Sequence, residues 1–568
     1  MSGPFQVEGN VAAALFTLKI HRGEGMALLA MNWRKGQPPD DFIGFAIEYR
    51  EPNGSRFFPL KNRLTFESNA GDTPSAARPP TYSTLVAPIQ KFRWVHFARN
   101  AQLDGAFSYR VKPVFMGEDG ALSYGVAQTA DIVLARETVP GALNVAFTRG
   151  FISSQAFVDH YEHDGPVNTL LPGKASDGLD FKPTHKDAVD AYAWMGFEAR
   201  REIVALLDAA VADESAKVGV VAFDFNLPEI MRRIVALGPR VRIIIDDSKD
   251  HHGKGAAEDK AEQRLMAAGI QVRRQHMQSL QHNKIMVVNG DAVKRVLCGS
   301  TNMSWRGFYV QNNNAFVVEG QPAVDVFEAA FDQYWNAPEG FGKSTSAGWS
   351  DLQIGGVDAK IAFSPHDSQN SVLQGIADDV TAAESSLFYS LAFLNITPGV
   401  IRDALKAKSG DDDVFVAGIS DKRTGVEVAV GSSNLPPTYV AALDKNAPSP
   451  FREEPSGGGG AHMHHKFLVI DFDTETARTY LGSYNMSKAA DGQNGENLVL
   501  VRDRRVATSY MIEAVRIIDH YQFRVARKAA KREGLKLKLQ RPPAAGGAPW
   551  WAEDYSDPRK IKDRKLFA

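Results

Sequence analysis

The chain has 568 residues, of which 44% are hydrophobic, and 65 basic side chains nearly balance 67 acidic ones. A chain of this length is expected to form roughly three or four domains, and its near-neutral charge gives no general attraction for nucleic acid. A single cysteine, Cys298, excludes internal disulfides and multi-cysteine zinc sites, and neither a membrane span nor a signal-peptide pattern is found, so the cytoplasm is the expected compartment.

Residues 1–140 are predicted to form β structure. The run "FIGFAIEYREPNGSRFFPL" contains two strand-like stretches around Asn53-Gly54, a dipeptide that accepts the positive φ angles of a tight hairpin. A second such pattern surrounds Asp104-Gly105, with aromatic residues alternating with polar ones. This periodicity predicts a β-sandwich and resembles fibronectin type III or immunoglobulin-like modules. Residues 141–180, rich in Gly, Pro and Asp, are predicted to be a connector.

From residue 181 onward the hydrophobic pattern changes to alternating strands and helices. "EIVALLDAAVA", "VGVVAFDF", "LPEIMRRIVALG" and "VRIIIDDS" follow one another, and the same order returns after residue 370. We therefore expect an α/β fold with two duplicated lobes and mostly parallel sheets, at residues 181–345 and 346–541, followed by a tail at 542–568. The seam between the lobes is placed at "GKSTSAGWSD".

Each predicted lobe ends in a related block. The first reads "QHNKIMVVNGDAVKRVLCGSTNMSWRGFYVQNNNAFVV" and the second "MHHKFLVIDFDTETARTYLGSYNMSKAADGQNGENLVL". Each has a His-x-Lys pair, an apolar strand, a Gly-Ser-x-Asn-Met-Ser turn and a Gln-Asn segment. His282 to Gln311 and His464 to Gln493 both span 29 residues, which supports a common fold for the two blocks.

The His-x-Lys spacing has a direct physical reading. Residues at i and i+2 of a strand point to the same face, so each block offers an imidazole beside an ammonium. The Gly-Ser-x-Asn turn adds a hydroxyl and an amide. Two facing blocks would suit a tetrahedral phosphate, with one histidine attacking phosphorus and the other protonating the departing oxygen.

These motifs resemble the phospholipase D superfamily, whose signature is His-x-Lys, four residues, Asp, and then a Gly-Ser-x-Asn turn. The resemblance implies a two-lobed fold and phosphodiester hydrolysis through a phosphohistidine, without a metal or other cofactor. In the first block Asn289 replaces the family aspartate, and Asp291 is a candidate to compensate. The expected catalytic residues are His282, Lys284, His464, Lys466, Asp471 and Glu496, and the expected substrate-binding residues are Ser300, Asn302, Asn314, Ser483 and Asn485.

The two histidines are expected to have different roles. Glu496 occupies the Gln-Asn-x-Glu position, and a carboxylate bonded to His464 would stabilise its charged form. At the position of Glu496 the first block has Asn314, whose amide would orient His282 without stabilising an imidazolium. This pairing predicts His282 as nucleophile and His464 as general acid.

Other polar clusters are given structural interpretations. His462 and His465 have the wrong strand parity and are predicted to be bystanders, and a zinc site built from them is not expected. "DDSKDHH", residues 246–252, is predicted to be a solvated turn, with cation binding as the alternative. "SGGGGAH", residues 456–462, is predicted to be either a lid or an incidental insertion. The basic segment 524–541 is predicted to be a solvated helix face, with contact to an anionic surface as the alternative.

Three functions remain open at this point. A phospholipase D acting on phospholipid headgroups is the first hypothesis, because nucleases usually need a basic groove and the chain is near neutral. A nuclease is the second, because "HHKFLVID" and "NGENLVLV" resemble the small bacterial nuclease branch. A catalytically inactive binding module is the third and depends only on Asn289. A phosphatidyl-transferring lipid synthase is disfavoured, since such members usually carry membrane spans.

Overall fold

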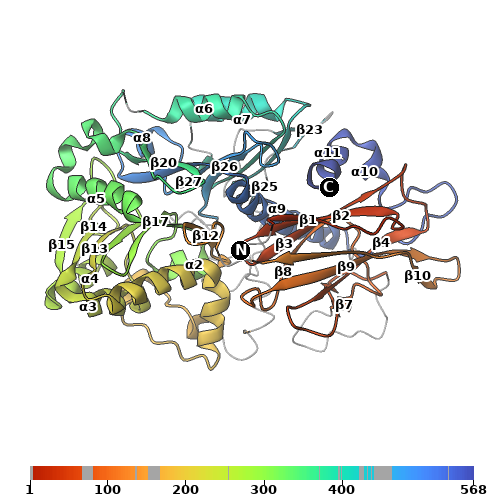
Figure 1. Ribbon diagram of the computed structural model, residues 1–568, viewed down its shortest axis with the longest axis horizontal. Helices are drawn as coiled ribbons and strands as arrows, with labels where there is room; N and C mark the ends of the chain where they lie inside the picture. Colours follow the sequence, from red (N-terminus) through yellow and green to blue (C-terminus); the bar gives the residue numbers. More distant parts are fainter. Residues whose placement is uncertain are drawn as a thin grey trace. The chain divides into compact units, whose positions relative to one another are not determined.

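The computed structural model divides the chain into two compact units (Figure 1). The first unit comprises Met1–Arg136, Ala429–Asn434 and Gln522–Ala568, and the second comprises Glu137–Val428 and Leu435–Tyr521. The described residues are 4–66, 81–134, 137–150, 161, 167–253, 255–369, 371–394, 397, 399–420, 428–430, 433–435, 438–439, 463–534 and 537–568. Among the helices of these ranges, none has the length and apolar character to cross a bilayer.

The first unit contains two antiparallel sheets around one hydrophobic core. One sheet has the order β1 (Gln6–Glu8), β2 (Phe16–Gly23), β3 (Met26–Trp33) and β8 (Arg93–Phe97). The other has the order β10 (Leu122–Tyr124), β9 (Ala106–Met116), β4 (Phe42–Arg50) and β5 (Phe58–Pro59), with β11 (Gln128–Val133) also paired to β9. A separate pair is formed by β6 (Lys61–Asn62) and β7 (Tyr82–Ser83). The resemblance to fibronectin or immunoglobulin modules remains a prediction.

The two predicted turns of this unit differ. Asn53 has a φ of 61° and lies between β4 and β5, which pair as a hairpin. Gly105, with a φ of 112°, lies between β8 and β9, but β8 pairs with β3 and β9 with β4. The second turn therefore carries the chain from one sheet to the other instead of closing a hairpin.

The C-terminal segment packs onto the first unit. It contains α10 (Ala552–Ser556) and α11 (Pro558–Phe567). Trp550 stacks on Phe92 with ring centroids 5.4 Å apart and donates a hydrogen bond to the carbonyl oxygen of Phe42 at 3.0 Å. Residues 542–568, predicted to be a tail, are thus a packed part of this unit, because their aromatic side chains join its core.

The first lobe of the second unit is a seven-stranded mixed sheet. Its order is β12 (Leu143–Phe147), β18 (Asn314–Glu319), β17 (Lys294–Gly299), β16 (Ile285–Asn289), β13 (Lys217–Ala222), β14 (Val241–Asp246) and β15 (Gln271–Gln275). Only β13, β14 and β15 run parallel. The predicted mostly parallel sheet is therefore wrong, because strands β16 to β18 follow one another through short connections. Strand β12 also places part of the predicted connector within this sheet.

Helices cover both faces of this sheet, which explains the continuous apolar runs of its central strands. Helices α2 (Ala188–Ala212), α3 (Pro228–Leu237) and α4 (Ala257–Ala267) lie on one side, and α5 (Gln321–Asn336) lies on the other (Figure 1). Short helical turns occur at Val167–Thr169, Ala175–Asp177, Gly238–Arg240, Arg306–Val310, Pro338–Lys343 and Thr345–Ala347.

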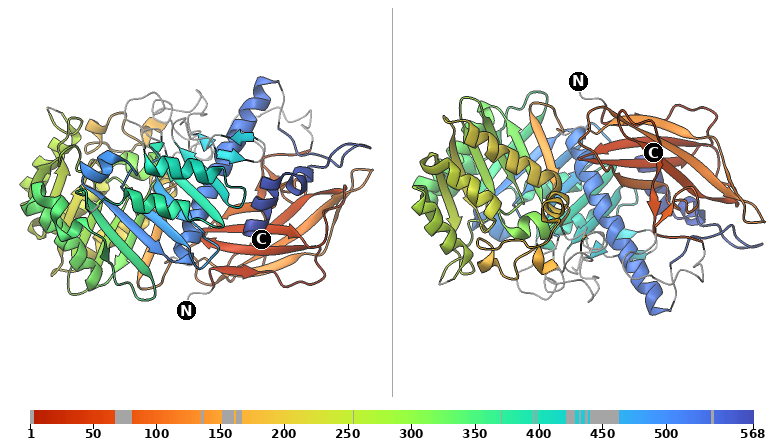
Figure 2. Two further views of the ribbon diagram at one scale, coloured as in Figure 1. Left: turned by 90° about the horizontal axis from the view of Figure 1, so that it is seen from above. Right: turned by 90° about the horizontal axis from the view of Figure 1, so that it is seen from below.

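The second lobe repeats this arrangement. Its order is β19 (Ser350–Asp351), β20 (Asp358–Ser364), β28 (Glu496–Arg502), β27 (Arg478–Gly482), β26 (Lys466–Ile470), β21 (Ser386–Leu391), β22 (Phe415–Ser420) and β25 (Thr438–Tyr439). Helices α6 (Leu373–Thr381) and α7 (Val400–Ser409) lie side by side over this sheet (Figure 2). The lobe also contains α8 (Lys488–Gly492), and β23 (Val428–Val430) pairs with β24 (Ser433–Leu435). The matching strand order confirms the predicted duplication.

Two sequence predictions concern segments that lie wholly or partly outside the described residues. The predicted lid at 456–462, including His462, lies outside the described residues. Helix α9 (Arg504–Arg532) carries part of the basic segment, but the side chains of Arg524, Arg527, Lys528 and Lys531 are not among those described, and neither is residue 536.

Candidate active site

The two lobes meet through the segments that flank the His-x-Lys motifs. Gln281 forms a parallel bridge with Gly495, and Met463 forms one with Asn312. Each bridge joins the residue before a motif histidine to the Gln-Asn segment of the opposite lobe. This reciprocal exchange brings His282 and His464 together, with ring centroids 6.3 Å apart and ring planes at 70°.

His282 is held by a carboxylate from the second lobe. Its Nδ1 lies 2.7 Å from Oε2 of Glu496, and both side chains are buried. The hydroxyl of Ser483 donates to the same oxygen at 2.6 Å, and the amide of Asn494 donates to Oε1 at 3.1 Å. The Nε2 atom of His282 has no hydrogen-bond partner among the described residues, so it is available to a substrate.

His464 is held by an amide from the first lobe. Its Nδ1 lies 2.8 Å from Oδ1 of Asn313, whose Nδ2 donates to the carbonyl oxygen of Gly307 at 2.9 Å. The predicted pairing of Glu496 with His464 and of Asn314 with His282 is therefore wrong, because each partner comes from the opposite lobe. Within the described part of the chain, Nε2 of His464 also has no hydrogen-bond partner.

A difference of one residue explains why the sequence matched Glu496 with Asn314. The backbone N–H of Ser300 donates to the carbonyl oxygen of Asn314, and that of Ser483 donates to that of Asn497, both at 3.1 Å. Asn314 thus corresponds to Asn497, and Asn313 to Glu496. The segment from His464 to Gly482 is one residue longer than the segment from His282 to Gly299, and the equal 29-residue spacing conceals this extra residue.

The two lysines lie next to the histidines, although His282, Lys284 and His464 precede strands β16 and β26. Lys284 donates to the carbonyl oxygen of His282, and Lys466 donates to that of His464 at 2.7 Å. Burial lowers the pKa of Lys284 to about 8, although the charges of Glu496, Asp224 and Asp246 act in the opposite direction. The first-lobe ammonium is therefore easily lost at alkaline pH.

The serines and asparagines of the two Gly-Ser-x-Asn turns make different contacts. Asn302 donates from Nδ2 to Oδ2 of Asp224 at 2.8 Å, and Ser483 supports Glu496 as described above. Buried Oδ1 atoms of Asn302 and Asn485 have no hydrogen-bond partner among the described residues. Ser300 accepts the backbone N–H of Asn314 at 3.0 Å and so stabilises the turn itself.

Asn314 and His465 point away from the histidine pair. Nδ2 of Asn314 lies 3.5 Å from Nδ1 of His465, and Nε2 of His465 lies 3.0 Å from Oε1 of Glu513. The structure therefore gives Asn314 no contact with His282, contrary to the expected orienting role. His465 has the opposite strand parity from His464, as the sequence predicts.

Asp471 lies at the far end of β26 from His464. Its Oδ1 accepts the backbone N–H groups of Glu384, Ser385 and Ser386 at 2.9, 2.8 and 3.2 Å. The expected catalytic role has no support in this geometry, because the carboxylate is fully engaged in fixing the start of β21. Asp471 contacts neither motif histidine.

Asn289, in the corresponding position of the first lobe, donates to both carboxylate oxygens of Glu328 at 3.0 Å. In the first lobe the link that Asp471 makes in the second is made by Asp213. This carboxylate accepts the backbone N–H groups of Ala292 and Val293 at 2.8 and 3.1 Å. The compensation comes from Asp213 and not from the carboxylate of Asp291. The replacement of the family aspartate by Asn289 therefore removes no contact from the histidine pair.

Burial and neighbouring charges keep both histidines neutral at rest. Burial and the nearby lysines lower the pKa of His282, while the charge of Glu496 opposes them. Burial, Lys466 and Lys284 place the pKa of His464 well below its ordinary value. Two ammonium groups beside neutral imidazoles form a site that favours an anion, and a bound anion would raise both histidine pKa values again.

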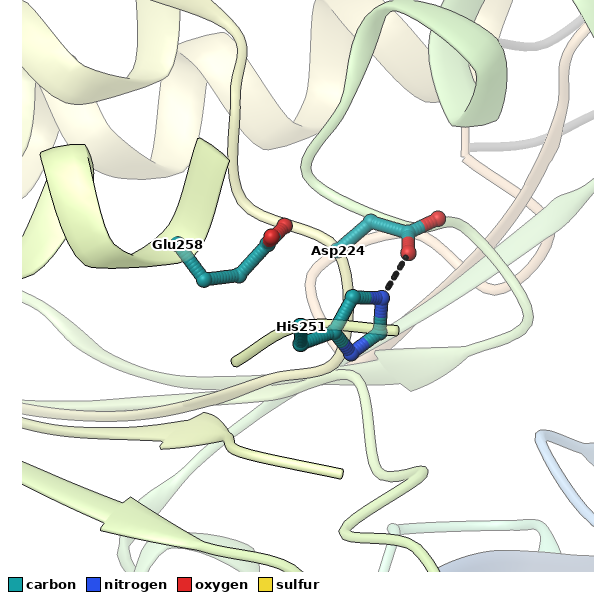
Figure 3. A group of neighbouring side chains, drawn as sticks. All are labelled: Asp224, His251 and Glu258. Atoms are coloured by element: carbon teal, nitrogen blue, oxygen red, sulfur yellow. Dashed lines mark hydrogen bonds and ion pairs between the residues drawn. The ribbon is translucent and has the colours of Figure 1, made fainter. Parts of the chain in front are cut away.

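A second cluster lies beside the first-lobe lysine and was missed by the sequence interpretation. Asp224, His251 and Glu258 have possible metal-ligand atoms within 4.8 Å of one another (Figure 3). Asp246 and His251 are buried, so the predicted solvated turn at 246–252 is wrong for these two residues. The sequence does contain a signal for this cluster, because acidic residues occur at the ends of two buried strands. The carboxyl ends of neighbouring parallel strands lie close together in a sheet.

One family model matches both lobes of the second unit. Residues 203–335 and 381–517 match the family model described as "Cardiolipin synthase, PLD-like domain". No curated protein matches the chain. Among solved structures, a polyphosphate kinase from Porphyromonas gingivalis matches at 10% identity and a TM-score of 0.39, over 64% of this chain and 51% of the kinase. The chain thus spans about half the length of that kinase.

Two further solved structures are similar over different lengths. Nuc, a phospholipase D family member from Salmonella typhimurium, matches at 26% identity and a TM-score of 0.20, over 24% of this chain and 86% of Nuc. A phosphatidylserine synthase from Haemophilus influenzae matches at 13% identity and a TM-score of 0.41, over 65% of this chain and 93% of the synthase.

Proposed function

Because the chain belongs to the phospholipase D superfamily, we propose that it hydrolyses phosphodiesters through a covalent phosphohistidine, with phospholipid headgroups as the first substrate class. One observation carries this proposal. The two motif histidines lie 6.3 Å apart between ring centroids, each is held through Nδ1, and each keeps Nε2 for a substrate. This is the arrangement needed for a nucleophile on one side of a phosphate and an acid on the other.

His282 is proposed as the nucleophile. Its Nε2 attacks phosphorus while the bond from phosphorus to the leaving oxygen breaks, and the ring becomes cationic as the P–N bond forms. Glu496 accepts the Nδ1 proton in a hydrogen bond and stabilises that positive charge. The assignment to His282 matches the sequence prediction, although the carboxylate now supports the nucleophile instead of the acid.

His464 is proposed as the general acid and then the general base. The anionic phosphate of a bound substrate raises the pKa of His464, and the protonated ring then gives its Nε2 proton to the leaving oxygen. The transfer is favourable because the partner, Asn313, is neutral and stabilises an imidazolium less than a carboxylate would. A water molecule then attacks phosphorus, His464 takes a proton from it, and the P–N bond breaks. Lys284 and Lys466 balance the phosphate charge, so no metal is required by this scheme.

Charge favours a small diester over a nucleic acid. The whole chain carries a formal net charge of −2, and the carboxylates of Asp224 and Asp246 lie close enough to Lys284 to act on its charge. A long polyanion would meet repulsion there, whereas a neutral or cationic headgroup would not.

The test is hydrolysis of a substrate panel by the full chain. Phosphatidylcholine, phosphatidylethanolamine and phosphatidylglycerol vesicles are compared with single-stranded and double-stranded DNA, with the double variant His282→Ala/His464→Ala as background. Release of headgroup above that background is expected. Cleavage of DNA alone would identify a nuclease, and binding of phosphodiesters without any hydrolysis would identify an inactive binding module.

A further inference from the structure

The two halves of the proposed site differ beside their Gly-Ser-x-Asn turns. Lys284 lies 4.7 Å from the ring centroid of Phe223, and Lys466 lies 5.8 Å from that of Phe393. Each phenylalanine closely follows the end of its strand, β13 or β21. Val221 pairs with Ile285 and Ser390 pairs with Phe467, so the strand registers match Asp224 with Phe393. Among the described residues, only the first lobe has a carboxylate at this position.

Asp224 is fixed from two sides. Its Oδ2 accepts from Nδ2 of Asn302 at 2.8 Å, and its Oδ1 lies 2.9 Å from Nε2 of His251. The other ring nitrogen of His251 lies 2.7 Å from Oδ2 of Asp246. An imidazole placed between two carboxylates is stabilised as an imidazolium, which balances part of the negative charge at this point.

These contacts indicate that Asp224 is a carboxylate fixed by hydrogen bonds and not a ligand of a metal ion. A metal ion would need a ring nitrogen of His251, but both nitrogens already face carboxylate oxygens. Glu258, the third member of the group in Figure 3, accepts the backbone N–H of Phe225 at 3.1 Å. Burial and the charge of Asp224 raise the pKa of Glu258 to about 7, so this carboxyl is partly protonated near neutral pH.

We propose that Asp224, held by His251, is a positioning residue present in the first lobe only: it fixes the amide of Asn302 and keeps Lys284 in its ammonium form. The inference rests on the proposed phosphodiesterase function, because Asn302 and Lys284 act on the substrate phosphate. Asp224 itself acts through these two side chains.

The charges around Lys284 determine the direction of the effect. Glu496 on β28, Asp246 at the end of β14 and Asp224 favour the ammonium, whereas burial opposes it. The other charged or titratable groups at this part of the site include His251, Arg306, Glu258, the motif histidines and Lys466. Because the pKa of Lys284 is already about 8, loss of one carboxylate moves it below that value and removes the ammonium at a lower pH.

Two substitutions separate the charge from the hydrogen bond. Asp224→Asn removes the charge but keeps an oxygen that accepts from Asn302, and Asp224→Leu removes both. Asp247→Asn is the matched control, because Asp247 bonds the exposed ring of His276 at 2.6 Å and contacts neither motif histidine. Thermal melting of each variant identifies any loss of fold.

The readout is the pH profile of kcat/KM for bis(p-nitrophenyl) phosphate. The alkaline limb of Asp224→Asn should move down by about one pH unit, with about a tenfold loss at pH 8.5 and little change at pH 6.5. Asp224→Leu should lose about a further tenfold at all pH values, because Asn302 is no longer held. Asp247→Asn should follow the wild-type profile. A profile of Asp224→Asn that superimposes on the wild type would overturn the inference.

If the wild-type chain hydrolyses no diester, the proposed function is refuted. The role of Asp224 is then tested by a second measurement that does not need catalysis. Binding of inorganic phosphate is measured calorimetrically at pH 6.5 and 8.5. Asp224→Asn should lose about tenfold more affinity between these pH values than the wild type. An equal loss in both proteins would overturn the inference, and so would zinc or manganese binding that requires Asp224, His251 and Glu258.

Discussion

Replacing Glu496 by glutamine tests how the buried carboxylate supports His282. The substitution preserves the size of the side chain and an oxygen that can accept from Nδ1, 2.7 Å away in the native protein. It removes the negative charge that stabilises a cationic His282 ring. It also removes the strongest of the charges that keep Lys284 protonated.

The expected loss follows from these two contacts. A hydrogen bond to a charged group contributes about 1.5–3 kcal/mol and a neutral one about 0.5–1.5 kcal/mol, so the exchange costs roughly 1–1.5 kcal/mol, or about tenfold in rate. Loss of the carboxylate lowers the pKa of Lys284 from about 8 by roughly one unit or more. At pH 7 this leaves half of the ammonium or less, for a combined loss of about 20- to 100-fold in kcat/KM.

The assay is the pH profile of bis(p-nitrophenyl) phosphate hydrolysis per folded molecule, with Asp471→Asn as the matched control. Asp471 is a buried carboxylate of the same block, but it accepts from the backbone at the start of β21 and from the hydroxyl of Thr476, and it contacts neither motif histidine. Its substitution should lower the free energy of unfolding by about 1–3 kcal/mol and change kcat/KM by less than threefold. Equal activity losses in the two variants, or a Glu496→Gln activity within threefold of the wild type, would refute the reasoning.

Three other predictions concern the metal, the leaving group and the C-terminal segment. Activity should persist in excess EDTA because Lys284 and Lys466 supply the positive charge, and loss with rescue by zinc or magnesium would contradict this. With p-nitrophenol, which needs no proton to depart, His464→Ala should be partly active and His282→Ala inactive, and the reverse order would exchange their roles. Removing residues 542–568 should destabilise the first unit by about 3 kcal/mol or more, as its calorimetric transition will show, because Trp550 leaves the core.

The sequence was sufficient to find the centre of the site because the relevant rule is local. The His-x-Lys spacing keeps each lysine close to its histidine, and Lys284 and Lys466 donate to the carbonyl oxygens of His282 and His464. The motif histidines themselves precede strands β16 and β26. The repeated order of elements likewise predicted two lobes with the same strand sequence. Both inferences depend on neighbouring residues and on repetition, which one sequence displays.

The partners of the histidines could not be predicted in this way, because they depend on contacts between lobes. A single extra residue between His464 and Gly482 shifted the apparent match of Glu496 from Asn313 to Asn314. The exchange across the lobes then gave Glu496 to His282 instead of His464. Neither the extra residue nor the exchange of partners between lobes changes the local pattern of either block. Hydrophobic periodicity therefore could not predict either of them.

The role of Asp471 shows a different limit. Its fixed place after the His-x-Lys strand made it look catalytic, but spacing along a strand also carries a side chain away from the site. Asp471 is seven residues after His464, and seven residues of extended chain span roughly 23 Å. The carboxylates that do adjoin the first-lobe lysine, Asp224 and Asp246, follow other strands and come together only in the folded sheet.

The central claim is that one motif histidine forms a covalent bond to phosphorus. The direct measurement is rapid mixing of the full chain with bis(p-nitrophenyl) phosphate, a denaturing quench at high pH and mass spectrometry of the peptides. The account predicts a phosphoryl adduct on His282, more abundant in His464→Ala because hydrolysis of the intermediate is slowed. An adduct on His464 would reverse the assigned roles, and turnover with no adduct on either histidine would contradict the account.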